Sequence, residues 1–88
     1  MPAGPQHTPG YRRLTALLRR VREEAALSQR EMSRRLRGAR APAVRVSLDP
    51  SMVHRTETGD RRIDPMEFIG WCQACGCDPA ETLRELYK

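Results

Sequence analysis

Three aspartate–proline pairs constrain the fold of this chain more than any other feature. They stand in the stretches "LDPSMV", "IDPMEF" and "CDPAET". An aspartate side chain can accept a hydrogen bond from a free amide of a first helical turn, and proline at the first helical position has no amide to leave unpaired. The sequence therefore predicts helices that begin at Pro50, Pro65 and Pro79. Gly59 and Gly76 are expected to end the first two of them.

Two further helices are predicted before these three. Apolar residues recur at helical spacing from Tyr11 to Ala25, with Thr8 as the expected cap. The stretch "LSQREM" begins the next helix with Ser28 as its cap, and this helix is expected to run to about Leu36. Glutamates three residues after a cap are expected to complete capping boxes at Glu31, Glu67 and Glu81.

Five helices follow from these signals, and the only strand-like stretch is residues 44–48. The predicted fold class is therefore all-α. A chain of 88 residues forms one domain with a small core, which argues against a large enzyme pocket. The sequence contains no paired carboxylates, nucleophile elbow or phosphate loop, so we do not expect an enzyme.

The charge balance of the chain points to a polyanionic partner. Sixteen basic residues face eleven acidic ones, giving a net charge of +5, and all the basic residues except Lys88 are arginines. The planar guanidinium group suits phosphate oxygens and guanine edges. The alternative is that the basic surface reflects only the general amino-acid usage of the source and has no polyanionic partner.

Nothing in the sequence predicts export or membrane insertion. The N-terminal stretch "MPAGPQHTPG" is interrupted by proline and glycine, and no apolar run is long enough to span a bilayer. We therefore expect a cytoplasmic protein with Cys72, Cys75 and Cys77 as reduced thiols.

Three cysteines fall short of the four ligands of a closed zinc site, so no metal and no cofactor are expected. At least one of Cys72 and Cys75 should be a core residue, on the same helix face as Phe68.

The stretches "LSQREMSRRL" and "SMVHRTETGDRR" resemble the two halves of a helix-turn-helix of the Cro/C1 type, the phage-repressor-like XRE family. The likeness extends from Leu14 to Leu86 and includes "ETG", the "GDRRID" turn and the "ACGCDPAETL" join. It implies a five-helix, lambda-repressor-like domain that binds DNA. It also implies a division into a flexible N-terminal tail, 1–10, and a single helix-turn-helix domain, 11–88, with an inserted loop at 39–47.

The resemblance also implies roles for individual residues. In such a motif the second helix lies in the major groove, and the first helix crosses the DNA backbone. The residues expected to contact bases are Pro50, Ser51 and Arg55, with His54 at the edge of that surface. The residues expected to contact the backbone are Gln29, Thr58, Arg61 and Arg62. Val53 and Thr56 should point inward, and Glu57 should form a structural ion pair with Arg22.

Two features depart from the family pattern. Ala26 stands where the family usually has glycine, so this residue must adopt a positive φ or the turn must shift. The connection between the two motif helices is roughly ten residues longer than the three or four residues of a tight helix-turn-helix turn. Its Arg40 and Arg45 are either phosphate or minor-groove contacts or part of a solvated mobile loop.

We expect a sequence-specific, double-stranded DNA-binding transcriptional regulator, a repressor that acts as a homodimer on a pseudo-palindromic operator. One short recognition helix reads few base pairs, so two half-sites about 34 Å or a multiple apart are expected. Leu83, Leu86 and Tyr87 either form the dimer contact or close the monomer core. The alternative function is an antitoxin or adaptor-type module that binds another protein through the same fold.

Overall fold

The computed structural model describes residues 8–38 and 48–87, and these residues form five helices and no strand. The all-α fold class is thus confirmed. The helices are α1 (Pro9–Glu24), α2 (Gln29–Arg37), α3 (Pro50–Thr58), α4 (Pro65–Cys75) and α5 (Pro79–Arg84). The predicted inserted loop at 39–47, with Arg40 and Arg45, lies outside the described residues, and so do residues 1–7 of the predicted tail.

The five N-caps are those that the sequence predicts. At each helix start the cap side chain accepts a hydrogen bond from the amide three residues ahead, the caps being Thr8, Ser28, Asp49, Asp64 and Asp78. The return bond of a capping box is present at Glu31 and Glu67. At α5 the structure gives only the first half of the predicted box, from the Glu81 amide to Asp78. Because α1 begins at Pro9, Pro9 and Gly10 belong to this helix and not to the predicted tail.

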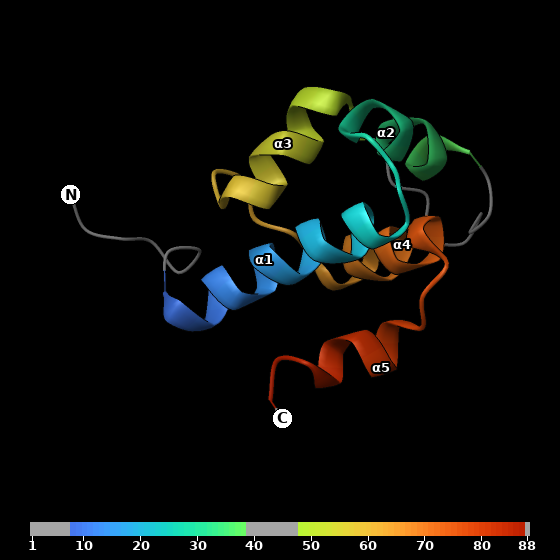
Figure 1. Cartoon of the computed structure of the whole chain (residues 1–88). Coiled ribbons are helices and arrows are strands. Elements are labelled where there is room, and N and C mark those ends of the chain that lie inside the picture. The colour runs from blue at the N-terminus through green and yellow to red at the C-terminus, as the bar shows by residue number, and fades with distance from the viewer. Residues whose placement is uncertain (1–7, 39–47, 88) are drawn as a thin grey trace.

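The helices are arranged with α2 and α3 on one side of α1 and α4, and with α5 on the opposite side (Figure 1). The largest fully buried side chain is that of Trp71 on α4, and its indole N–H donates to the carbonyl of Leu18 on α1 at 3.0 Å. Met32 on α2 and Val53 on α3 are also fully buried. One small core therefore holds α2 and α3 in a fixed relation to α1 and α4.

The cysteines belong to this core or to its edge. Cys72 is fully buried, which confirms that at least one thiol is a core residue, and the Cys75 Sγ lies 3.8 Å from the Met32 Sδ. Burial raises the pKa of Cys72 and of Cys75 to about 12. In the described ranges no three histidine, cysteine or acidic residues are grouped as metal ligands would be.

The turn between α1 and α2 contains a strained residue, which is one of the two outcomes that the family pattern left open. Ala26 has a φ of 59°, in the left-handed region that disfavours residues with a Cβ. The Arg22 Nη1 donates to the carbonyl of Leu27 at 2.7 Å and holds the end of this turn. None of the helices in the described part of the chain has the length and apolar character needed to cross a membrane.

Candidate nucleic-acid interface

Helix α3 has one buried face and one exposed face. Val53, Thr56 and Glu57 are buried against the rest of the domain. The exposed residues recur at helical spacing, three or four positions apart, and they are Ser51, His54, Arg55 and Thr58. We call these four residues the outer face of α3. Its polar and basic side chains form a surface that suits a polyanion.

An ion pair fixes α3 on the domain. Arg22 of α1 donates from Nε and Nη2 to the two carboxylate oxygens of Glu57, and the Nη2–Oε1 distance is 3.0 Å. Both residues are buried, and the hydrogen bonds from the guanidinium to Glu57 raise the pKa of Arg22 above its usual range. The two residues named as a structural pair therefore meet between α1 and α3.

Gln29 connects the start of α2 to the outer face of α3. Its Nε2 lies 3.1 Å from the Glu57 Oε1 and 3.4 Å from the Nδ1 of exposed His54. The first amides of a helix have no acceptor within the helix and carry the positive end of its dipole. The N-terminus of α2 thus lies beside α3, and the Gln29 side chain supports α3.

The turn after α3 contains two arginines in different states. Arg61 is half-buried, and its Nη1 and Nη2 donate to the two carboxylate oxygens of Glu67, the first at 3.0 Å. These hydrogen bonds raise the pKa of Arg61, so its guanidinium has a structural role at the start of α4. Arg62 is exposed, and its side chain makes no hydrogen bond or ion pair within residues 8–38 and 48–87. Arg55 on α3 is also exposed, and its side chain likewise makes no hydrogen bond or ion pair within these residues.

The other predicted contact residues lie at the two ends of α3. Pro50 is half-buried at the first position of the helix, next to its cap Asp49. At the other end, the Thr58 hydroxyl donates to the Arg55 carbonyl at 3.1 Å. Both residues border the outer face, but the Thr58 side chain already has a partner in its own helix.

Four exposed arginines on α2 were not among the predicted contacts, and one of them, Arg35, donates to the Ala74 carbonyl on α4. Arg30, Arg34 and Arg37 recur four and three positions apart, so they share one side of the helix. The spacing is visible in the sequence "QREMSRRLR", but which side of α2 meets α3 depends on the tertiary fold.

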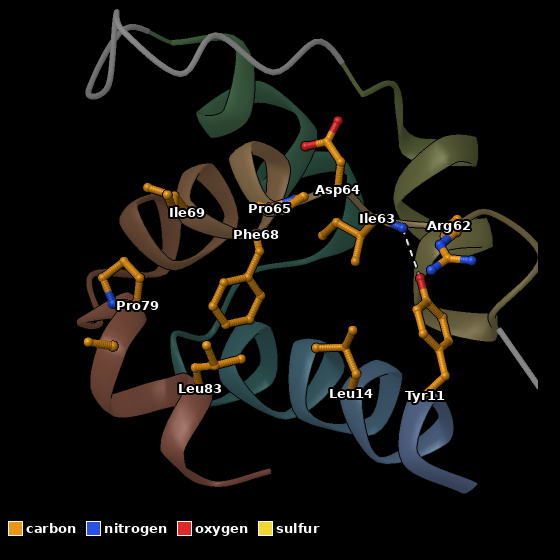
Figure 2. Close-up of a pocket in the computed structure, with 11 residues that line it drawn as sticks. Tyr11, Leu14, Arg62, Ile63, Asp64, Pro65, Phe68, Ile69, Pro79 and Leu83 are labelled. Carbon is orange, nitrogen blue, oxygen red and sulfur yellow. Dashed lines mark hydrogen bonds between the residues drawn. The ribbon is translucent and has the colours of Figure 1, made fainter. Parts of the chain in front are cut away.

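A hollow of about 600 Å³ lies on a different part of the surface, between α1, α4 and α5 (Figure 2). Leu14, Phe68 and Leu83 contribute much of its apolar lining, and Arg62 and Asp64 stand at its edge. The Tyr11 hydroxyl at one end accepts a hydrogen bond from the Ile63 amide at 2.8 Å. This lining suits an apolar contact and not a nucleic acid.

The fold and the exposed helix α3 define a helix-turn-helix domain. A family model described as a helix-turn-helix domain matches residues 13–86, so the chain belongs to this family. No curated protein and no solved structure matches the chain at a significant level. Helix-turn-helix domains bind DNA with the second helix of the motif, which is α3 in this chain.

Proposed function

We propose that this protein is a sequence-specific, double-stranded DNA-binding transcriptional regulator of the Cro/C1 type that represses by occupying its operator. The observation that carries the proposal is the outer face of α3, which is polar, basic and exposed on a helix that the Arg22–Glu57 pair holds in place. A rigid support is what base readout requires, because side chains must meet base edges in one register. The cytoplasmic location predicted from the sequence is part of the same proposal.

Arg55 is the residue proposed to carry most of the base reading. It is exposed near the middle of α3, and its guanidinium has no partner in the described part of the chain. A bidentate contact from arginine to guanine contributes about 1–3 kcal/mol of discrimination. Pro50, Ser51 and His54 complete the surface proposed to meet the bases.

The backbone contacts are proposed on both sides of α3. The N-terminus of α2 at Gln29 faces one strand, and Thr58 and Arg62 face the other. Arg61 remains a candidate for the same strand, although its pairing with Glu67 leaves it fewer free N–H groups than Arg62. Arg40 and Arg45 remain predicted phosphate or minor-groove contacts.

A homodimer is proposed because one recognition helix contacts too few base pairs for useful specificity. Leu83 and Tyr87 support a contact near α5, since they are 43% and 71% exposed. Leu86 packs partly on the core, which leaves the first two residues as the apolar surface available to a second copy. In a two-fold contact the same patch on both copies is buried.

Selection of bound sites from a random DNA library tests this proposal. The purified protein should enrich a pseudo-palindrome with half-sites about 34 Å or a multiple apart. Enrichment of a single half-site would contradict the dimer and leave sequence reading intact. If the bound DNA at low salt shows no enriched sequence, sequence-specific binding is contradicted.

A further inference from the structure

Helix α2 carries a basic surface that the proposed base and phosphate contacts do not use. It consists of Arg30, Arg34 and Arg37, which we call the α2 arginine stripe. All three residues are exposed and share one side of the helix. The question is which partner this surface faces.

Contacts on the other sides of α2 fix the direction of the stripe. Gln29 contacts Glu57 on α3, and the Ser33 hydroxyl donates to the Leu48 carbonyl just before α3 at 2.6 Å. On the α4 side, the Arg35 Nη1 donates to the Ala74 carbonyl at 3.1 Å. At 3.6 residues per turn, the stripe is centred about 90° from the edge that meets α3 and about 130° from Arg35 on the edge that meets α4. The stripe therefore flanks α3 and faces away from α4.

The stripe also differs from Arg19 and Arg20 of α1 in its charge partners. On α1, Arg19 pairs with Glu23, and Arg20 lies 3.8 Å from both Glu24 and Glu85. No arginine of the stripe forms a salt bridge with a residue in the described ranges. The hydrogen bonds with Ser28 are the main cause of the lowered pKa of Glu31, and Arg34 adds only a longer-range contribution. The positive charge on this side of α2 is thus left for an outside partner.

Helix stability does not explain the placement of Arg30. Arg34 and Arg37 lie in the last turn of α2, where cations interact favourably with the helix dipole. Arg30 lies in the first turn, where the same dipole disfavours a cation. A residue placed against the dipole and beside the outer face of α3 fits an anion that binds there.

We propose that the α2 arginine stripe binds phosphates of the DNA strand beside the groove that receives α3. The stripe spans about 10 Å along the helix axis, and a DNA strand carries one phosphate per 3.4 Å of its axis, so two or three phosphates lie within reach. This inference rests on the proposed function, because it needs α3 to be docked in a groove. Its role is to fix the position of α3 and not to read sequence.

Two double variants with the same loss of charge test the stripe. R30A/R34A removes two of its arginines, and R13A/R84A removes two exposed arginines from α1 and α5. The slope of log K against log salt, measured on the selected site, should become shallower by about 1.8 for R30A/R34A. The slope should stay at the wild-type value for R13A/R84A, and R30K/R34K should retain it as well.

The single variant R30A separates DNA binding from folding. Because Arg30 opposes the dipole of α2, R30A should unfold at the same temperature as the wild type or higher, while binding selected and random DNA more weakly by similar factors. A lowered unfolding temperature with unchanged affinity would contradict the proposal.

Three results distinguish failure of the stripe from failure of the proposed function. If R30A/R34A keeps the wild-type salt slope and affinity while R55A still loses selectivity, the phosphate contact of the stripe is contradicted and the proposed function is not. Equal losses of salt slope in R30A/R34A and R13A/R84A would show that the effect depends only on net charge. This result would also contradict the phosphate contact of the stripe. A wild-type protein that binds no DNA at low salt would overturn the proposed function itself.

Discussion

Arg22 of α1 and Glu57 of α3 are 35 positions apart in the sequence and are joined by two hydrogen bonds within the protein. The same guanidinium donates to the Leu27 carbonyl, and the same carboxylate accepts from Gln29. One buried pair therefore ties α1, the turn after it, and α2 to the helix that carries the proposed reading surface. The position of that surface depends on this pair.

Removal of one partner should destabilise the domain strongly. E57A leaves the buried Arg22 charge uncompensated, and the expected loss in the free energy of unfolding is about 3 kcal/mol or more. Urea denaturation followed by circular dichroism measures it. The control E23A, which removes an exposed partner of Arg19, should cost less than about 1 kcal/mol. Similar losses in the two variants would show that the Arg22–Glu57 pair does not hold the fold together.

Ala26 offers a stabilising change. Its φ of 59° is unfavourable for a residue with a Cβ, and glycine adopts it without steric cost. A26G should therefore raise the free energy of unfolding by up to about 1 kcal/mol. A25G, one residue earlier at a φ of −81°, is the matched control and should not stabilise. A loss of stability in A26G would mean that the turn has a different conformation.

The thiols of Cys72, which is buried, and of Cys75, which is partly buried, should be unreactive near neutral pH. Burial raises the pKa of Cys72 and Cys75 from 9.0 to about 12, so the thiolate that attacks an alkylating reagent is scarce in the folded protein. At pH 8, iodoacetamide should label these two residues only after unfolding in urea, as mass spectrometry of the peptides will show. Rapid labelling of both in the native protein would contradict their burial.

The same shift predicts how stability depends on alkaline pH. The folded state favours the neutral thiol, so the contribution of Cys72 and Cys75 is complete below pH 9 and is lost as the pH rises toward about 12. The free energy of unfolding should fall over this interval. The variant C72A/C75A should show a smaller fall, and an equal fall would assign the effect to other groups.

The helix starts could be predicted from the sequence because their causes are local. A cap and the amide that it binds are three residues apart, so Ser28 and Asp64 identify their helices without any knowledge of the tertiary fold. The start of α1 at Pro9 follows from Thr8 in the same way. The positive φ at Ala26 was one of two options that the family pattern left open.

The long-range contacts could not be predicted from local patterns. Arg61 looked like a free phosphate contact, yet its pairing with Glu67 requires the chain to turn between α3 and α4. The direction of the α2 arginine stripe depends on which edge of α2 meets Leu48 and which meets Ala74. Periodicity groups such residues on one side of a helix, but only tertiary packing shows what that side faces.

The turn arginines should separate structural from DNA-binding roles. R62A should weaken binding to selected and random DNA by similar factors and leave the unfolding temperature unchanged, because its exposed side chain has no partner in the described part of the chain. R61A should weaken both kinds of binding and also lower the unfolding temperature, because it removes the pair with Glu67. Thermal unfolding followed by circular dichroism distinguishes the two.

The most direct test of the proposed reading surface is the ratio of affinities for the selected site and for random DNA, measured for the wild type and for R55A. If Arg55 reads a guanine, the ratio should fall by a factor corresponding to about 1–3 kcal/mol, while affinity for random DNA changes little. An unchanged ratio, with equal losses on both DNAs, would contradict base reading by the outer face of α3.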